Sequence, residues 1–163
     1  MTSCSIGVGD TSLFAPLPVR PGNMYRTGSG APGPRYWQQR ADYELKASID
    51  TAAKRVNGSM TLRYTNNSPD TLRYIWIQTE QNAFKSGSLN SYIFPPDSRF
   101  GALSFEGGLN FTRFDLLSGP ATRPVRSKLT PRDNGTVARI ELPTPLAPGQ
   151  TAVFDVAWNF RRE

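Results

Sequence analysis

The feature that most constrains the fold is a pair of alternating segments separated by a cluster of turn-forming residues. From Met60 to Tyr64, apolar and polar residues alternate with a period of two, as in a strand with one buried face. Residues 66–70, Asn-Asn-Ser-Pro-Asp, end that pattern, because Asn and Asp hydrogen-bond to nearby backbone and proline fixes φ. Residues 72–77 are largely apolar on both faces, which is typical of a central strand. We therefore predict a hairpin over residues 60–82.

Alternation divides the second strand of this hairpin into two faces. Tyr74 and Trp76 share one face, and Ile75 and Ile77 share the other. A central strand is covered on both faces. We therefore predict that Trp76 is buried, and that Arg63, on the polar face of the preceding strand, is exposed.

The residues before this hairpin are expected to add a third strand. Residues 41–49 alternate cleanly, and the cluster 50–54 turns the chain back toward residues 56–64. We therefore predict a three-stranded antiparallel meander over residues 41–80. A short helical turn is expected after it, over residues 82–89.

The second half of the chain carries another hairpin signal and the most apolar strand face. Asn-Gly within the turn 131–135 supplies the positive φ of a tight turn, so residues 125–129 are expected to pair with residues 137–142. The final strand, at residues 152–160, has one continuous apolar face. Its members are Ala152, Phe154, Val156, Trp158 and Phe160.

Length and composition favour one β domain behind a tail. A chain of 163 residues is long enough for one domain with a hydrophobic core. Residues 1–35 contain five prolines and six glycines, so we expect an extended tail there. Residues 36–163 are expected to form an all-β domain, either an antiparallel β-sandwich or saddle-like sheets.

The net charge does not indicate a specific nucleic-acid partner. The formal charge of +6 arises from 19 basic and 13 acidic residues. A basic protein attracts nucleic acid, but here the arginines are scattered one per predicted element, without a basic run or an aromatic-basic repeat. Solvated strand faces explain them better. We expect DNA binding to be weak, nonspecific and sensitive to salt.

The sequence lacks the residues of the commonest catalytic and metal sites. It contains no histidine, and Cys4 is its single cysteine. Histidine is the usual general base and zinc ligand, and one thiolate cannot build a metal site. The carboxylates occupy polar strand positions or turn clusters, where structural roles are expected. We predict no catalytic, cofactor-binding or metal-ligating residue in this chain.

Glycosylation sequences and aromatic residues are the other candidate surface features. The Asn-x-Ser/Thr sequences begin at Asn57, Asn66, Asn110 and Asn134. Most lie in or beside predicted turns, where Asn is favoured for backbone reasons. The aromatic candidates for a sugar-stacking surface are Tyr36, Trp37, Tyr74, Trp76, Tyr92 and Trp158. Their alternation with Leu and Ile favours core packing instead.

The sequence contains no signal for a membrane span or for export. No run of about 18 apolar residues occurs, so we expect no transmembrane segment. The first residues have neither the basic head nor the apolar core of a signal peptide. The sequence alone does not indicate where the protein is located.

Two segments resemble a known protein family. They are residues 34–45, PRYWQQRADYEL, and residues 58–78, GSMTLRYTNNSPDTLRYIWIQ. Both are similar to the amino-terminal domain of bacterial zinc metallopeptidases related to aminopeptidase N. The resemblance covers residues 32–84, and a looser likeness extends over residues 101–160. It implies a saddle of antiparallel sheets, in a family whose members are often exported.

The resemblance implies an active family and an inactive chain. In that family the chemistry lies in a following thermolysin-like domain, where His-Glu-x-x-His and a downstream Glu hold zinc, and a Gly-x-Met-Glu-Asn loop grips the substrate amine. This chain contains neither motif. The resemblance therefore implies a noncatalytic scaffold and docking domain, a truncated metallopeptidase fragment. Its partner would be the missing catalytic domain, in cis or in trans, and the zinc would belong to that domain.

The fragment interpretation has a consequence for stability, and one alternative stands beside it. A domain incomplete at its carboxyl-terminal end is expected to expose the apolar face and the edge of its final strand. We therefore expect marginal stability and self-association through the C-terminal strand. The alternative is a stand-alone β-sandwich module that binds carbohydrate or protein.

Overall fold

The computed structural model describes residues 21–93, 107–119 and 126–161. The chain divides into two compact units, Met1–Trp37 and Gln38–Glu163, and each is considered by itself. Residues 1–20 of the predicted tail lie outside the described part.

The described residues of the first unit form a closed loop rather than an extended tail. Thr27 N–H donates to the Ala31 carbonyl at 2.9 Å, and Arg35 N–H donates to the Met24 carbonyl at 2.8 Å. The loop requires glycine at position 33, because a Cβ there would lie 2.5 Å from the Met24 carbonyl oxygen. Backbone hydrogen bonds across the loop therefore overcome the preference of this Pro/Gly-rich composition for open chain.

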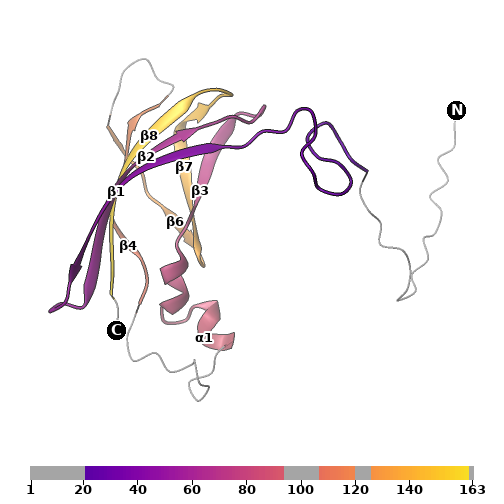
Figure 1. The fold of residues 1–163 in the computed structure, drawn as a ribbon. Helices are drawn as coiled ribbons and strands as arrows, with labels where there is room; N and C mark the ends of the chain where they lie inside the picture. Colours follow the sequence, from indigo (N-terminus) through magenta and orange to yellow (C-terminus); the bar gives the residue numbers. More distant parts are fainter. Residues whose placement is uncertain (1–20, 94–106, 120–125, 162–163) are drawn as a thin grey trace, which may run out of the picture. The chain divides into compact units, whose positions relative to one another are not determined.

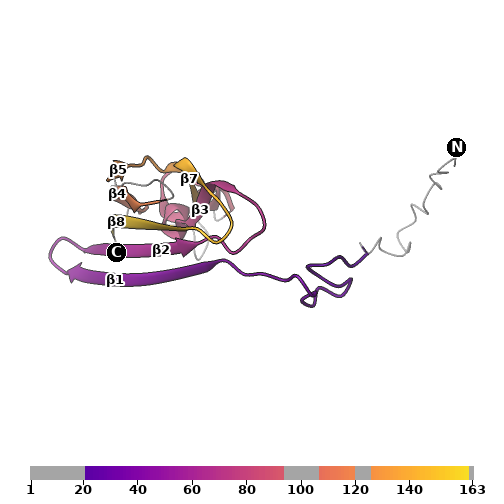
Figure 2. The ribbon, with the colours of Figure 1, turned by 90° about the horizontal axis from the view of Figure 1, so that it is seen from above.

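The second unit is all-β, with two antiparallel sheets, as the sequence predicted (Figure 1). The larger sheet has the order β1-β2-β8-β4-β5 (Figure 2), with β1 Arg40–Asp50, β2 Arg55–Thr65, β8 Thr151–Arg161, β4 Asn110–Ser118 and β5 Ser127–Lys128. The smaller sheet has the order β3-β7-β6, with β3 Leu72–Gln78, β7 Val137–Leu146 and β6 Arg132–Asn134. The predicted helical turn after β3 is present as a 3₁₀ turn, Glu80–Phe84, followed by a five-residue helix, α1, Leu89–Ile93.

The core lies between the two sheets. Phe114 is its centre, with Phe111 and Phe154 meeting it edge to face at centroid distances of 5.5 and 5.9 Å. The buried residues that pack together are Leu62, Ile75, Phe114, Leu116, Leu129, Ile140, Leu146, Ala152, Phe154 and Val156. They come from both sheets, as expected for a sandwich.

The predicted hairpin over residues 60–82 is wrong, and with it the three-stranded meander. β1 and β2 do form the expected hairpin, with the turn at residues 51–54. β3, however, leaves β2 and pairs with β7 in the other sheet, where it is an edge strand. The turn-forming cluster thus carries the chain between sheets instead of folding it back.

The burial of Trp76 was predicted from the same assumption and is also wrong. Trp76 is 49% exposed, whereas its neighbour Ile75 is 6% exposed. The alternation was read correctly, because Ile75 and Ile77 face the core. No described segment covers the opposite face of β3, so Tyr74 and Trp76 are exposed. Arg63 is exposed, as predicted.

The final strand is buried within a sheet, whereas an exposed face and edge were predicted for it. β8 lies inside the larger sheet, paired with β2 along one side and with β4 along the other. Its apolar face is core, with Phe154 and Val156 fully buried. The expected exposure of this strand, and self-association through it, are therefore corrected, because both of its edges already have partners. Within the described residues, one edge of this sheet is β1, and the other is β4 with the two-residue β5.

The structure confirms the turn of the predicted second hairpin but not the pairing of residues 125–129 with residues 137–142. β6 and β7 are joined by a two-residue turn in which Gly135 has a φ of +63°, the conformation that Asn-Gly was expected to supply. Of residues 125–129, which were expected to pair with β7, Ser127–Lys128 form β5 and pair with β4 in the larger sheet.

Asn66 fixes the crossing between the sheets. Its side chain is fully buried, and its Nδ2 donates to the carbonyls of Asp70 at 2.8 Å and of Leu146 at 2.9 Å. Its Oδ1 accepts from the Ser68 backbone N–H at 3.0 Å and from Gln39 Nε2 at 3.1 Å. One carboxamide therefore joins β2, the crossing segment and the end of β7.

We expect Asn66→Ala to lower the free energy of unfolding by about 3 kcal/mol, because buried polar groups left without partners cost about 1–3 kcal/mol each. Urea unfolding of the whole chain measures the change. The matched control is Asn110→Ala, an exposed Asn at the start of β4, which should stay within about 0.5 kcal/mol of the parent. Equal losses from the two variants would contradict the role given to Asn66.

A second pair of substitutions tests the orientation of β3. Ile75→Ala should cost about 2–5 kcal/mol, because it opens a cavity in the core. Trp76→Ala removes a half-exposed ring and should cost about 1 kcal/mol. The reverse order in urea unfolding would mean that β3 presents its other face to the core.

Candidate functional site

An open apolar groove of about 450 Å³ runs between the larger sheet and the edge of the smaller one. Its lining residues are Tyr43, Leu45, Met60, Leu62, Tyr64, Ile75, Trp76, Ile77, Gln78, Leu109, Phe111 and Trp158. None of these carries a formal charge at neutral pH. The groove is therefore a surface for apolar contact, with a single amide among its lining side chains.

The groove exists because the two sheets differ in width. The larger sheet extends to β1, and every residue of β1 is exposed. Tyr43 and Leu45, which point to the same face as the core residues of β2, are 62% and 57% exposed. The inner face of β1 thus continues the core surface without a layer packed against it.

Trp158 forms part of the groove because of a glycine opposite it. Gly58 on β2 pairs with Trp158 on β8, and a Cβ at Gly58 would lie 2.5 Å from the indole ring. The missing side chain lets the ring lie across β2 and reach the groove. Nothing in the alternation of residues 56–64 indicates that Gly58 makes room for a neighbouring ring.

The phenol of Tyr64 stays neutral within the groove. Burial raises its pKa above the ordinary value, and the nearby Tyr43 phenol adds to this increase. A tyrosine already titrates near pH 10, so the shift removes it further from the neutral range. The groove therefore offers neither a general base nor a charged group at neutral pH.

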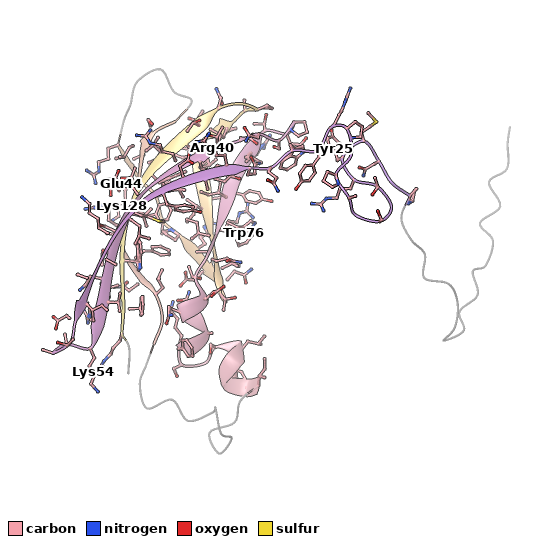
Figure 3. All side chains as sticks on the ribbon, in the orientation of Figure 1. Tyr25, Arg40, Glu44, Lys54, Trp76 and Lys128 are labelled. Carbon is pink, nitrogen blue, oxygen red and sulfur yellow. The ribbon has the colours of Figure 1, made fainter. Side chains whose placement is uncertain are left out.

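Trp76 forms the rim of the groove on the smaller sheet (Figure 3). Beside it, Tyr74 meets Trp76 edge-on, with an angle of 83° between the rings. The guanidinium of Arg139 covers one face of Tyr74 at 3.9 Å from the ring centroid. Arg139 Nε also lies 2.9 Å from a Glu141 oxygen, an ion pair without hydrogen-bond geometry.

The outer face of the larger sheet carries a separate network of charged residues. Asp115 on β4 lies opposite Asp155 on β8, and Arg126 donates to both, at 2.8 and 3.0 Å. Arg113 adds a second bond to Asp155 at 2.9 Å. Hydrogen bonding to Asp115 is the main cause of a raised pKa at Arg126. Both carboxylates are thus held as arginine partners, which is a structural arrangement rather than an acid/base pair.

The aromatic residues proposed from the sequence have different surroundings. Trp158 packs against the core, as predicted. The expectation of core packing is wrong for the others, whose exposed fractions range from 38% to 77%: Tyr36, Trp37, Tyr74, Trp76 and Tyr92. For Tyr74 and Trp76 the reason is that their face of β3 is uncovered within the described residues, which the alternation could not reveal.

The asparagines of the four glycosylation sequences differ in burial. Asn66 is buried and uses its amide in the sheet crossing, as expected of turn chemistry. The side chains of Asn57, Asn110 and Asn134 are exposed.

The described ranges hold neither a cluster of metal-ligating side chains nor a membrane-spanning helix. There, no group of three or more His, Cys, Asp or Glu residues comes together. Within the same ranges, no helix has the length and apolar character needed to cross a bilayer.

No protein-family model and no curated protein matches the sequence.

We predict that the isolated chain holds no stoichiometric zinc and hydrolyses no aminoacyl substrate. Without histidine and with one cysteine, its potential ligands are carboxylates, which by themselves suit zinc poorly. Elemental analysis of the purified chain, with an aminoacyl-anilide assay beside it, measures both properties. One tightly held zinc per chain would contradict the prediction.

Proposed function

We propose that this chain is a noncatalytic scaffold and docking domain, like the amino-terminal domain of the zinc metallopeptidases that its sequence resembles. The groove is the proposed docking site. Its occupant is an apolar segment of a zinc-binding catalytic domain, joined in cis or supplied in trans.

One observation carries this proposal. The two segments on which the resemblance is based, residues 34–45 and 58–78, supply all but three of the residues that line the groove. The exceptions are Leu109, Phe111 and Trp158. The part of the sequence that is similar to the metallopeptidase domain is thus the part that builds the exposed apolar surface.

The chemistry of the groove favours a polypeptide over a small polar ligand. Its lining is apolar and aromatic, which suits Leu, Phe or Met side chains of a partner. Beside it lies β1, which among the described strands has a partner on one side only. A catalytic mechanism finds no support here, since the groove has no charged residue and the paired aspartates lie on the opposite face of the sheet.

Carbohydrate binding is the second candidate, favoured by the exposure of Trp76 and Tyr74. Sugar rings stack on flat, accessible aromatic faces. Trp76 and Tyr74 are nearly perpendicular, and Arg139 already covers one face of Tyr74. These two contacts make the pair a poor platform, so we rank this function below docking.

The test begins with the gene. The proposal requires a domain with His-Glu-x-x-His, encoded in the same reading frame or by the adjacent gene, and the absence of such a domain would contradict it. Isothermal titration calorimetry then measures binding of that domain, produced separately, to the chain. Trp76→Ala should weaken binding at least tenfold, which is about 1.4 kcal/mol.

The control is Tyr74→Ala, which removes a neighbouring exposed ring that does not line the groove. It should leave the affinity for the catalytic domain within about twofold of the parent, a change of a few tenths of a kcal/mol. Equal losses from both variants, together with measurable binding of oligosaccharides, would favour the carbohydrate module instead.

A further inference from the structure

The outer edge of β1 is an open strand edge eleven residues long. β1 pairs with β2 from Arg40 to Asp50 without any shift of register, and nothing in the described sheet pairs with its other side (Figure 2). Such an edge presents a row of unpaired N–H and C=O groups. Of the devices that protect edge strands, a proline and a β-bulge do not occur in this strand, whereas charged side chains such as Lys46 do.

The charges along β1 are arranged so that the strand complements itself. Its outer face carries, in order, Arg40, Asp42, Glu44, Lys46, Ser48 and Asp50. When two copies of the strand run antiparallel about a twofold axis at Leu45, Glu44 lies opposite Lys46 of the second copy. In the same register, Arg40 lies opposite Asp50. Each of these pairs occurs twice, and cross-strand pairs of opposite charge stabilise a sheet.

We propose that this chain forms a homodimer in which β1 pairs with β1 of a second copy about Leu45, joining the two larger sheets into one. All eleven residues of the strand pair in this register. A protein with a different sequence at its edge would not reproduce this match of charges, so a second copy is the partner that the strand fits.

Neighbouring registers are disfavoured by the same charges. Moving the axis to Glu44 places Glu44 opposite itself and Arg40 opposite Ser48, and it keeps only Asp42 opposite Lys46 as a pair of opposite charge. Moving it to Lys46 places Lys46 opposite itself and Asp42 opposite Asp50. Both shifts keep the apolar face on one side of the sheet, so the loss of opposite-charge pairs and the repulsion between like charges are what disfavour them.

The inner face of β1 fits the same register. Leu45 meets Leu45, Tyr43 meets Ala47 and Ala41 meets Ile49, so each large side chain lies opposite a small one or its own copy. Tyr43 and Ile49 are 62% and 61% exposed in the single chain. Pairing would cover part of this apolar surface, which is unusual on an isolated edge strand.

An existing ion pair does not prevent this arrangement. Arg40 Nε lies 2.9 Å from Asp42, and the two side chains are 69% and 49% exposed. Exposed pairs of this kind contribute little to stability, so Arg40 can exchange Asp42 for Asp50 of the second copy. The charged contacts of the dimer lie on the face of the sheet opposite the groove, whereas its apolar contacts include Tyr43 and Leu45, which also line the groove.

Sedimentation equilibrium of the full chain tests the proposal, with an expected mass of twice 18.0 kDa. Glu44→Lys and Lys46→Glu each replace two attractive contacts by two repulsive ones, and each should raise the dimer dissociation constant roughly tenfold or more. Mixing these two variants restores opposite charges at both contacts. The mixture should therefore form a heterodimer as tight as the parent dimer.

Lys54→Glu is the matched control, since it makes the same change of charge in the turn beyond the paired strand (Figure 3). It should leave the mass unchanged, and circular dichroism checks that every variant is folded. A parent chain that is monomeric at all concentrations would overturn the proposal. So would a dimer unaffected by the single reversals, or a mixture of the two variants that stays monomeric.

Discussion

The fold depends on the hydrogen bonds of one buried carboxamide. Asn66 has no access to water, and its side chain binds backbone carbonyls that come from the sheet crossing and from the end of β7. Its backbone joins the same region, because its N–H donates to Gln150 and its carbonyl accepts from Gly149, at 2.9 and 2.6 Å. Two sheets with few shared backbone contacts are thereby held in one arrangement. An apolar residue could fill the space but would leave these carbonyls without a donor.

The difference in width between the sheets determines where the protein can interact. Three strands cover the centre of a five-stranded sheet, where Phe114, Phe154 and Val156 are buried. In the part of the chain that the structure describes, the strand at one side, β1, is uncovered on its inner face and unpaired along its outer edge. The groove and the self-complementary edge are thus two results of one architectural fact. They share the side chains of Tyr43 and Leu45 on the inner face, whereas the backbone groups and the charges of β1 belong to the edge alone.

The sequence predicted local structure well and the path of the chain poorly. Alternation identified β1, β2 and β8 and the correct faces of β3, because the period of two depends on neighbouring residues alone. It could not show that residues 66–70 cross between sheets, because a hairpin turn and a crossing use the same Asn, Ser and Pro chemistry. The incorrect prediction that Trp76 is buried followed from that error. The groove was beyond sequence reasoning for a similar reason, since it depends on which strands are absent opposite β1.

The position of Asn66 also bears on how the protein can be produced. The residue begins an Asn-Asn-Ser sequence, and a glycan is attached through the side-chain nitrogen. That nitrogen is the donor to Asp70 and Leu146. A sugar added during synthesis in a eukaryotic secretory pathway would occupy the donor before the sheets close and would find no space in the folded chain. The native crossing can therefore form in expression hosts that do not glycosylate Asn66. In a host that does, the fraction of secreted protein that is folded would equal the fraction in which Asn66 carries no glycan.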